Sequence, residues 1–286
     1  MQRVRKVLFP ADMSEASTAT VPFVEAMARH LKAELTLLHV MELGAAVTGW
    51  ETYMPPADLE SLRQTLRETF ERFLADRFQG LTVLRVVTEG DPAQEIVAQS
   101  QQLGADLIMM PTHGYGLFRS LLLGSVTAKV LHDAACPVWT GAHMEETSEE
   151  FAEFRNVLCA VDLSEETIEL MQFASTLANG FQAKLWLVHA VPAVETAPAR
   201  FLDAEFEADL EKDARAKIRQ LQEQAGVAGQ ICLGGGEIPK VIQHAAVQHE
   251  AGLIVIGRGE ATKSFGRLRS EVYSIIRESP CPVISM

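Results

Sequence analysis

One segment of the sequence has glycines and a hydroxyl at a spacing that could bind a phosphate. The apolar run at residues 107–110 is followed by Pro111-Thr112-His113-Gly114, and after nine further residues Gly124-Ser125-Val126 opens a helical pattern. A loop that leads from a strand into a helix offers backbone N–H groups and the positive end of the helix to an anion, and glycine lets the anion come close. Lys129, one turn into the helix, and Arg119, in the loop, could add positive charge.

The elements that would position this segment occur twice in the chain. Asp12, Ser14, Glu15 and His39 recur 150 positions later as Asp162, Ser164, Glu165 and His189. The repeat continues to the end of each half, where Cys136-Pro137-Val138 corresponds to Cys281-Pro282-Val283. Self-similarity over this length indicates duplication of a domain.

Short β-rich runs alternate with longer helical patterns in both halves, which predicts a parallel sheet with helices on both faces. We expect two tandem, doubly wound, five-stranded α/β domains of Rossmann-like architecture. The strands expected in the first half are residues 4–9, 34–40, 81–88, 105–110 and 137–140, and its helices are residues 14–32, 58–78, 92–103 and 125–133. In the second half we expect strands at residues 157–161, 184–188, 230–233, 253–256 and 282–285, and a charged, solvent-facing second helix at 201–224.

A length of 286 residues suits two domains. We expect the first at residues 1–141, an acidic linker at 142–153, and the second at 154–286. The stretch at residues 43–56, with Trp50 and Tyr53, is a long loop that either covers a pocket or packs locally. We favour local packing.

The composition excludes several classes of protein. A formal charge of −13 argues against nucleic-acid or anionic-membrane partners, because such binding needs clustered Lys and Arg. No apolar stretch is long enough for a membrane helix or a signal sequence, so we expect a cytoplasmic protein. The four cysteines form no CxxC pair and are expected to be buried thiols, which indicates neither a metal site nor redox chemistry.

The residues described so far resemble the universal stress protein family over nearly the whole chain. The resemblance rests on Asp12, His39-Val40, the Gly114 to Gly124-Ser125 spacing and Cys136-Pro137-Val138. It implies a tandem member in which two fused domains take the place of a homodimer, with further homodimer formation through the edges of the final strands as an open alternative.

The resemblance also implies a ligand, ATP or another adenine nucleotide with or without Mg²⁺, and a set of contacts in the first domain. Nucleotide-binding members carry GxxGxxxxxxxxxGS, and here Pro111 replaces the first glycine, removing one N–H and fixing φ. We therefore expect altered or weakened binding. The implied contacts to adenine and ribose are Asp12 and Val40, the phosphate contacts are Gly114, Gly124, Ser125 and Val126, and the nearby wall is Met110 and Pro111.

The second half does not keep this loop. Counting back from Cys281 places Ser270 opposite Ser125, but Arg269 stands where Gly124 does, so a bulky side chain replaces the glycine. The segment is basic, and we interpret it as a solvated loop with side-chain binding of an anion as the alternative; its basic residues are Arg258, Lys263, Arg267 and Arg269. Asp12 and Asp162 could equally cap helices, and His39 and His189 are expected to be structural.

Two classes of function remain open. The first is a cytoplasmic stress-response protein that senses an adenine nucleotide in its first domain. The second is a nucleotide-free interaction or chaperone-like scaffold in which Pro111 marks a decayed site, and a small-molecule or lipid binder in the second domain is a third reading. No P-loop, dinucleotide fingerprint or nucleophile elbow is present, so we expect binding, with slow ATP hydrolysis left open and no catalytic residue assigned.

Overall fold

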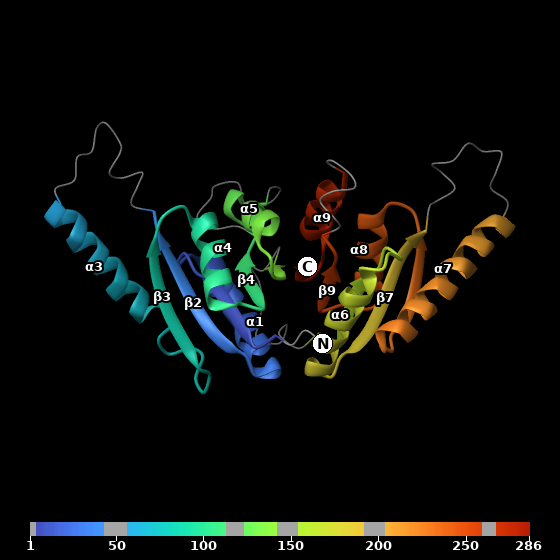
Figure 1. The fold of residues 1–286 in the computed structure, drawn as a ribbon, viewed down its shortest axis with the longest axis horizontal. Coiled ribbons are helices and arrows are strands. Elements are labelled where there is room, and N and C mark those ends of the chain that lie inside the picture. Colours follow the sequence, from blue (N-terminus) through green and yellow to red (C-terminus); the bar gives the residue numbers. More distant parts are fainter. Residues whose placement is uncertain (1–3, 43–55, 113–122, 142–153, 192–203, 259–266) are drawn as a thin grey trace. The chain divides into compact units, whose positions relative to one another are not determined.

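The structure is a computed structural model that describes the chain except residues 1–3, 43–55, 113–122, 142–153, 192–203 and 259–266, and it gives only the backbone of residues 56–57, 204–207 and 267–270. The chain divides into two compact units (Figure 1). The first unit is Val4–Val138, and the second is Trp139–Met286 together with Met1–Arg3. The expected linker lies outside the described residues, so its bounds stay a prediction.

The first unit alternates strands and helices as expected. Its elements are β1 (Lys6–Pro10), α1 (Glu15–Leu31), β2 (Glu34–Met41), α3 (Pro56–Arg72), β3 (Val83–Glu89), α4 (Pro92–Leu103), β4 (Leu107–Pro111), α5 (Ser125–Asp133) and β5 (Val138–Gly141), within which the division between the units falls. The strand order is β3-β2-β1-β4-β5. β1 is paired in parallel with β2 on one side and with β4 on the other.

The second unit repeats this order. Its elements are β6 (Asn156–Ala160), α6 (Thr167–Phe181), β7 (Lys184–Val191), α7 (Ala204–Ala225), β8 (Gln230–Gly235), α8 (Ile238–Gln248), β9 (Leu253–Ile256), α9 (Arg267–Glu278) and β10 (Val283–Ser285). The strand order is β10-β9-β6-β7-β8, with parallel pairing of β6 with both β7 and β9. The predicted doubly wound parallel architecture is confirmed in both halves.

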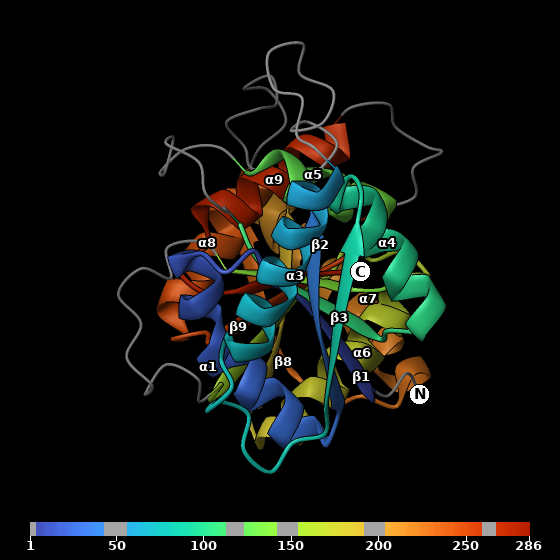
Figure 2. The same ribbon diagram turned by 90° about the vertical axis from the view of Figure 1, so that its left-hand side faces the viewer.

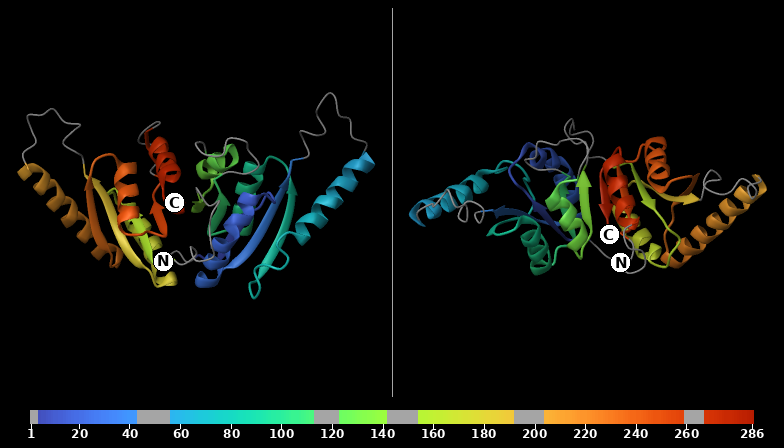
Figure 3. Two further views of the ribbon diagram at one scale, coloured as in Figure 1. Left: turned by 180° about the vertical axis from the view of Figure 1, so that it is seen from behind. Right: turned by 90° about the horizontal axis from the view of Figure 1, so that it is seen from above.

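The central strands are apolar on both faces because helices cover both faces of each sheet. Leu107–Pro111 in β4 and Leu253–Ile256 in β9 are buried along nearly their whole length. In the first unit, α1 and α3 lie on one side of β2 and β3 and α4 lies on the other (Figure 2). In the second unit, α6 packs on α7 and α8 packs on α9, and α7 (orange in Figure 3) runs beside the strands.

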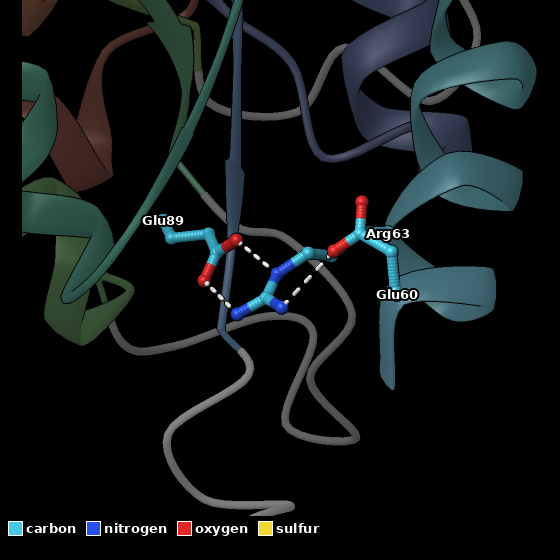
Figure 4. Close-up of polar contacts among 3 residues, drawn as sticks. All are labelled: Glu60, Arg63 and Glu89. Carbon is cyan, nitrogen blue, oxygen red and sulfur yellow. Dashed lines mark hydrogen bonds and ion pairs between the residues drawn. The ribbon is translucent and has the colours of Figure 1, made fainter. Parts of the chain in front are cut away.

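A charged pair attaches α3 to the end of β3. The Nε and Nη2 atoms of Arg63 donate to the two carboxylate oxygens of Glu89 at 2.5 and 3.1 Å, while Nη1 reaches Glu60 (Figure 4). The hydrogen bond from Arg63 lowers the pKa of Glu89. This bidentate contact joins the middle of α3 to the carboxyl end of β3.

Several expected boundaries were wrong. The second helix of the first half begins at Pro56, which we had placed in the loop, and it ends at Arg72 instead of 78. Leu74 and Phe78 adopt left-handed φ values of 57° and 61°, and Phe78 is buried with its N–H donated to Glu25. Burial of this aromatic ring competes with continuation of the helix.

The charged second helix of the other half also differs from expectation. α7 buries Ala214, Ile218 and Leu221 on one face, so it is amphipathic and not wholly solvent-facing. The third strand of this half runs past its expected end at residue 233, because Gly234 and Gly235 continue β8, and Gly236 follows with φ of 129°. Trp50 and Tyr53 of the long loop lie outside the described residues.

Candidate functional site

Three of the expected site residues of the first unit lie at one edge of its sheet. Asp12 follows β1, Val40 lies near the end of β2, and Pro111 ends β4. The three strands are parallel, so their carboxyl ends share an edge. β1 lies between β2 and β4 in the sheet, so the chain builds the sheet outward from β1 first in one direction and then in the other. Doubly wound folds bind ligands in the crevice beyond the point where the strand order reverses in this way.

Asp12 divides its two carboxylate oxygens between different environments. Oδ1 accepts hydrogen bonds from the N–H of Ser14 at 3.0 Å and from the hydroxyl of Ser17 at 2.6 Å. Ser14 is the residue that caps α1, accepting from the N–H of Ser17. Asp12 therefore organises the start of the helix without being its cap. Within the described part of the chain Oδ2 has no hydrogen-bond partner and is available to a ligand.

The start of α5 offers free backbone donors. Gly124 is the N-cap, makes no side-chain capping bond, and donates its own N–H to the carbonyl of Thr112 at 2.9 Å. The N–H groups of the first helical residues, Ser125 and Val126, have no acceptor one turn back within the helix. The hydroxyl of Thr127 donates to the carbonyl of Pro111 at 3.1 Å, which fixes this helix end to β4.

The structure places some of the remaining expected residues near this sheet edge and leaves others undescribed. Met110 is buried and Val40 and Pro111 are half-buried, as suits a wall, whereas Gly114, His113 and Arg119 lie outside the described residues. Lys129 does not reach toward the start of α5, because its Nζ contacts Asp91 at 3.1 Å. The hydrogen bond from the N–H of Gln94, together with Lys129, lowers the pKa of Asp91.

The two matched histidines are structural, as predicted. His39 Nδ1 lies 2.9 Å from the carbonyl of Ala11 and its ring stacks on Phe70, and His189 Nδ1 lies 2.7 Å from the carbonyl of Val161. A carbonyl only accepts, so Nδ1 carries a proton in both rings.

The second unit contains a cavity that the sequence did not reveal. It measures about 440 Å³ and lies where β6, β7, β9 and β10 end, between α6 on one side and α8 and α9 on the other. Its walls are mostly aliphatic, including Val188, Ile242, Ile256 and Ile275. The strand-end aspartate Asp162 lines it, matching the position of Asp12 in the first unit.

Asp162 repeats the division of oxygens seen at Asp12. Its Oδ1 accepts from the N–H and the hydroxyl of Ser164 at 3.0 and 2.7 Å and from the hydroxyl of Thr167 at 2.7 Å. Burial alone would raise the pKa of Asp162, but these hydrogen bonds outweigh it and lower the pKa. The carboxylate is therefore ionised at neutral pH.

The helix beside this cavity begins one turn earlier than its counterpart. α5 ends three residues before Cys136 and α9 ends three residues before Cys281, yet α5 begins at Ser125 and α9 at Arg267. Residues 270 and 271, which correspond to Ser125 and Val126, thus lie inside α9. Their N–H groups bond within the helix and are not free for an anion.

Other polar groups at this cavity are fixed by the protein itself. Arg258 lines the cavity, but its Nε donates to the hydroxyl of Ser285 at 3.3 Å and its Nη2 to the Ser285 carbonyl at 3.1 Å. The interpretation of Arg258 as a solvated loop residue was wrong, because it is half-buried against β10. Within the described residues, no three His, Cys, Asp or Glu side chains are grouped to hold a metal ion.

Disulfides join none of the four cysteines, all of which lie within the described residues. Cys159 and Cys281 are buried as expected, whereas Cys136 and Cys232 are only half-buried. Burial raises the pKa of Cys281 to about 12. Across the described part of the chain, no helix is long and apolar enough to cross a membrane.

The family model for the Universal stress protein family matches residues 3–140 and again 153–285. The chain belongs to the universal stress protein family. It is a tandem member, since the two matches cover both halves. Among single-domain relatives, Universal stress protein YxiE of Bacillus subtilis is 26% identical over 141 residues, which are 46% of this chain and 95% of that protein.

Other universal stress proteins extend the comparison. Universal stress protein MJ0577 of Methanocaldococcus jannaschii is 28% identical over 152 residues, covering 47% of this chain and 92% of its own. The crystal structure of a universal stress protein from Archaeoglobus fulgidus covers 99% of this chain and 96% of its own with a TM-score of 0.69 at 22% identity. That similarity supports the fold across both halves and carries no statement about a ligand.

Sequence reasoning missed the residues that make the second unit different. Glu271, Glu169 and Ile242 line the cavity, and none of them belongs to a binding motif. One signal was available, because Glu271 stands where Val126 stands in the first half. A carboxylate at a position expected to contact phosphate is unfavourable for that ligand.

Proposed function

We propose that the first unit binds an adenine nucleotide and that the protein acts as a cytoplasmic sensor or regulator in a stress response. The observation that supports this most is the start of α5, where Gly124 leaves space and the N–H groups of Ser125 and Val126 are free of intrahelical bonds beside the end of β4. Asp12 supports the adenosine part of the ligand, because its Oδ2 is open at the same sheet edge.

The residues present fit an adenine nucleotide in several respects. Val40, Met110 and Pro111 supply an apolar wall, and the positive end of α5 favours phosphate oxygens. Pro111 lacks an N–H, so phosphate contacts fall on α5 and on Gly114. Any Mg²⁺ would enter with the phosphates, since Mg²⁺ is usually held by substrate phosphates with one or two carboxylates. ATP, ADP and AMP remain the candidates, and binding without turnover is the proposed activity.

The substitution Gly124→Arg tests the site directly. Gly124 has φ of −57° and ψ of 145°, values that any residue adopts, so arginine should leave the fold intact while its side chain crowds the start of α5. We expect wild type to bind ATP in calorimetry, or to release an adenine nucleotide on acid treatment, and the variant to do neither.

Gly235→Arg is the matched control. It adds the same side chain in the second unit, where a Cβ atom at Gly235 would meet no heavy atom within 4 Å. Unchanged ATP affinity in Gly124→Arg would remove the site assignment. No nucleotide binding by either the wild type or the variants would make the nucleotide-free scaffold the leading function, with Pro111 marking a decayed site.

A further inference from the structure

The cavity of the second unit has a charge pattern that disfavours phosphate. Among the described residues, four acidic side chains and one Arg or Lys side chain line it. The acidic residues are Asp162, Glu166, Glu169 and Glu271, and the basic residue is Arg258. Arg258 has two of its donor nitrogens bonded to Ser285. Among the described lining residues, a phosphate would meet more negative than positive charge, and the N–H groups at positions 270 and 271 are already bonded inside α9.

The same groups favour a ligand that donates hydrogen bonds and carries positive charge. Asp162 is ionised, and its Oδ2 has no partner among the described residues. The ring of His189 lines the same cavity, with its Nδ1 held 2.7 Å from the carbonyl of Val161. Carboxylates at the end of the sheet are complementary to an ammonium group.

The remainder of the cavity fits an apolar body. Leu170, Ile238, Ile242, Ile256 and Ile275 come from four different elements around it. A volume of about 440 Å³ lies within the range of small-molecule sites. We propose that the second unit binds a small cationic amphipathic molecule, an amine on an apolar ring or chain, and excludes phosphorylated ligands. This inference is independent of nucleotide binding by the first unit.

Two probes of the same shape and opposite charge test the inference on the full chain. Tryptamine carries an ammonium group and indole-3-propionate a carboxylate on the same ring system. The experiment uses Gly124→Arg as the background, so that a nucleotide bound by the first unit cannot contribute. Calorimetry should show saturable tryptamine binding, with indole-3-propionate binding at least about tenfold more weakly, as one unfavourable charge contact of ~1.4 kcal/mol implies.

Glu271→Gln should weaken tryptamine binding about fivefold, the effect of one partly screened ion pair, without weakening indole-3-propionate. Glu223→Gln in α7 is the control, since it removes the same charge from the second unit at a position outside the cavity lining. If both variants weaken tryptamine binding equally, the preference for the ammonium probe comes from the net charge of the protein and not from the cavity, which overturns the proposal. Absence of tryptamine binding would also overturn the proposal. Tighter binding of indole-3-propionate or ATP than of tryptamine would overturn it as well, and would favour an anion site in the second unit.

Discussion

At the scale of single residues, the two strand-end aspartates each serve the fold with one oxygen. Oδ1 of Asp12 and Oδ1 of Asp162 each hold the start of the following helix through a backbone N–H and hydroxyl groups. The other oxygen makes no bond in the described part of either unit. Capping-type and ligand-binding interpretations of these residues are therefore compatible.

Substitution of Asp12 should separate the two roles. Asp12→Asn retains one oxygen that can accept from Ser14 and Ser17, but it puts an NH2 group in place of the open oxygen and removes the negative charge. We therefore expect near wild-type thermal stability with weaker ATP binding. Asp12→Ala removes both hydrogen bonds and should cost about 1–2 kcal/mol of folding free energy as well. Thermal unfolding and calorimetry on both variants measure the two effects. If Asp12→Ala keeps full ATP affinity, the carboxylate has no part in binding.

His249 is a second residue whose chemistry follows from its environment. Its ring stacks on Trp186 with centroids 3.6 Å apart, and its Nε2 is buried without a hydrogen-bond partner among the described residues. Burial lowers the pKa of His249. The folded state thus favours the neutral ring, while the unfolded chain takes up a proton as pH falls through about 6.5.

His249 should therefore make the second unit less stable as the pH falls below that value. We expect the urea midpoint, followed by tryptophan fluorescence, to drop between pH 7.5 and pH 5.5 in wild type, and to drop less in His249→Gln because that side chain does not titrate. His132→Gln, at an exposed position in the first unit, is the control. Identical pH dependence of wild type and His249→Gln would show that burial of this ring does not affect stability.

At the scale of elements, repetition made most of the fold predictable. Apolar runs such as those of β4 and β9 indicate buried parallel strands. Asp91-Pro92 has the residue types that favour a helix start, and in the structure Asp91 accepts a hydrogen bond from the N–H of Gln94 at the start of α4. The end of α3 was not predictable, because the burial of Phe78 and its bond to Glu25 are tertiary effects that join residues far apart in sequence.

The candidate sites show the same limit. Motif spacing placed Gly124, Ser125 and Val126 correctly at a helix start, since Gly124 interrupts the helical pattern. It did not show that α9 extends past the equivalent position, although Arg267-Leu268-Arg269 contains no residue that stops a helix and was therefore a signal for the extension. A cavity is a property of several elements at once, and no local pattern records it.

At the scale of the whole molecule, one duplicated unit supports two sites of different expected chemistry. The first retains a helix start with free donors, and the second has a cavity with carboxylates and an extended helix. Homodimer formation through the final strands and the range of the linker stay predictions. The chain as a whole is acidic, at −13, so electrostatics across the surface do not supply the attraction for a nucleotide. Local donors must do so.

This division predicts the stoichiometry of nucleotide binding. We expect one ATP per chain in calorimetry, and still one in Arg269→Gly, although that substitution restores the glycine found in the first unit. The N–H groups at positions 270 and 271 remain bonded within α9 when a single residue is changed. The double variant Gly124→Arg/Arg269→Gly should bind none. Two ATP molecules per chain in Arg269→Gly would show that the side chain alone blocks the second unit.

The earlier start of α9 has an evolutionary consequence. A site lost through one obstructing side chain can return by one substitution, and selection can restore it at any time. A site lost because the helix has grown through it requires several backbone hydrogen bonds to break together, which no single mutation achieves at low cost. For the second unit to become an anion site of the first kind, the backbone at the start of α9 would have to change together with the side chain at position 269.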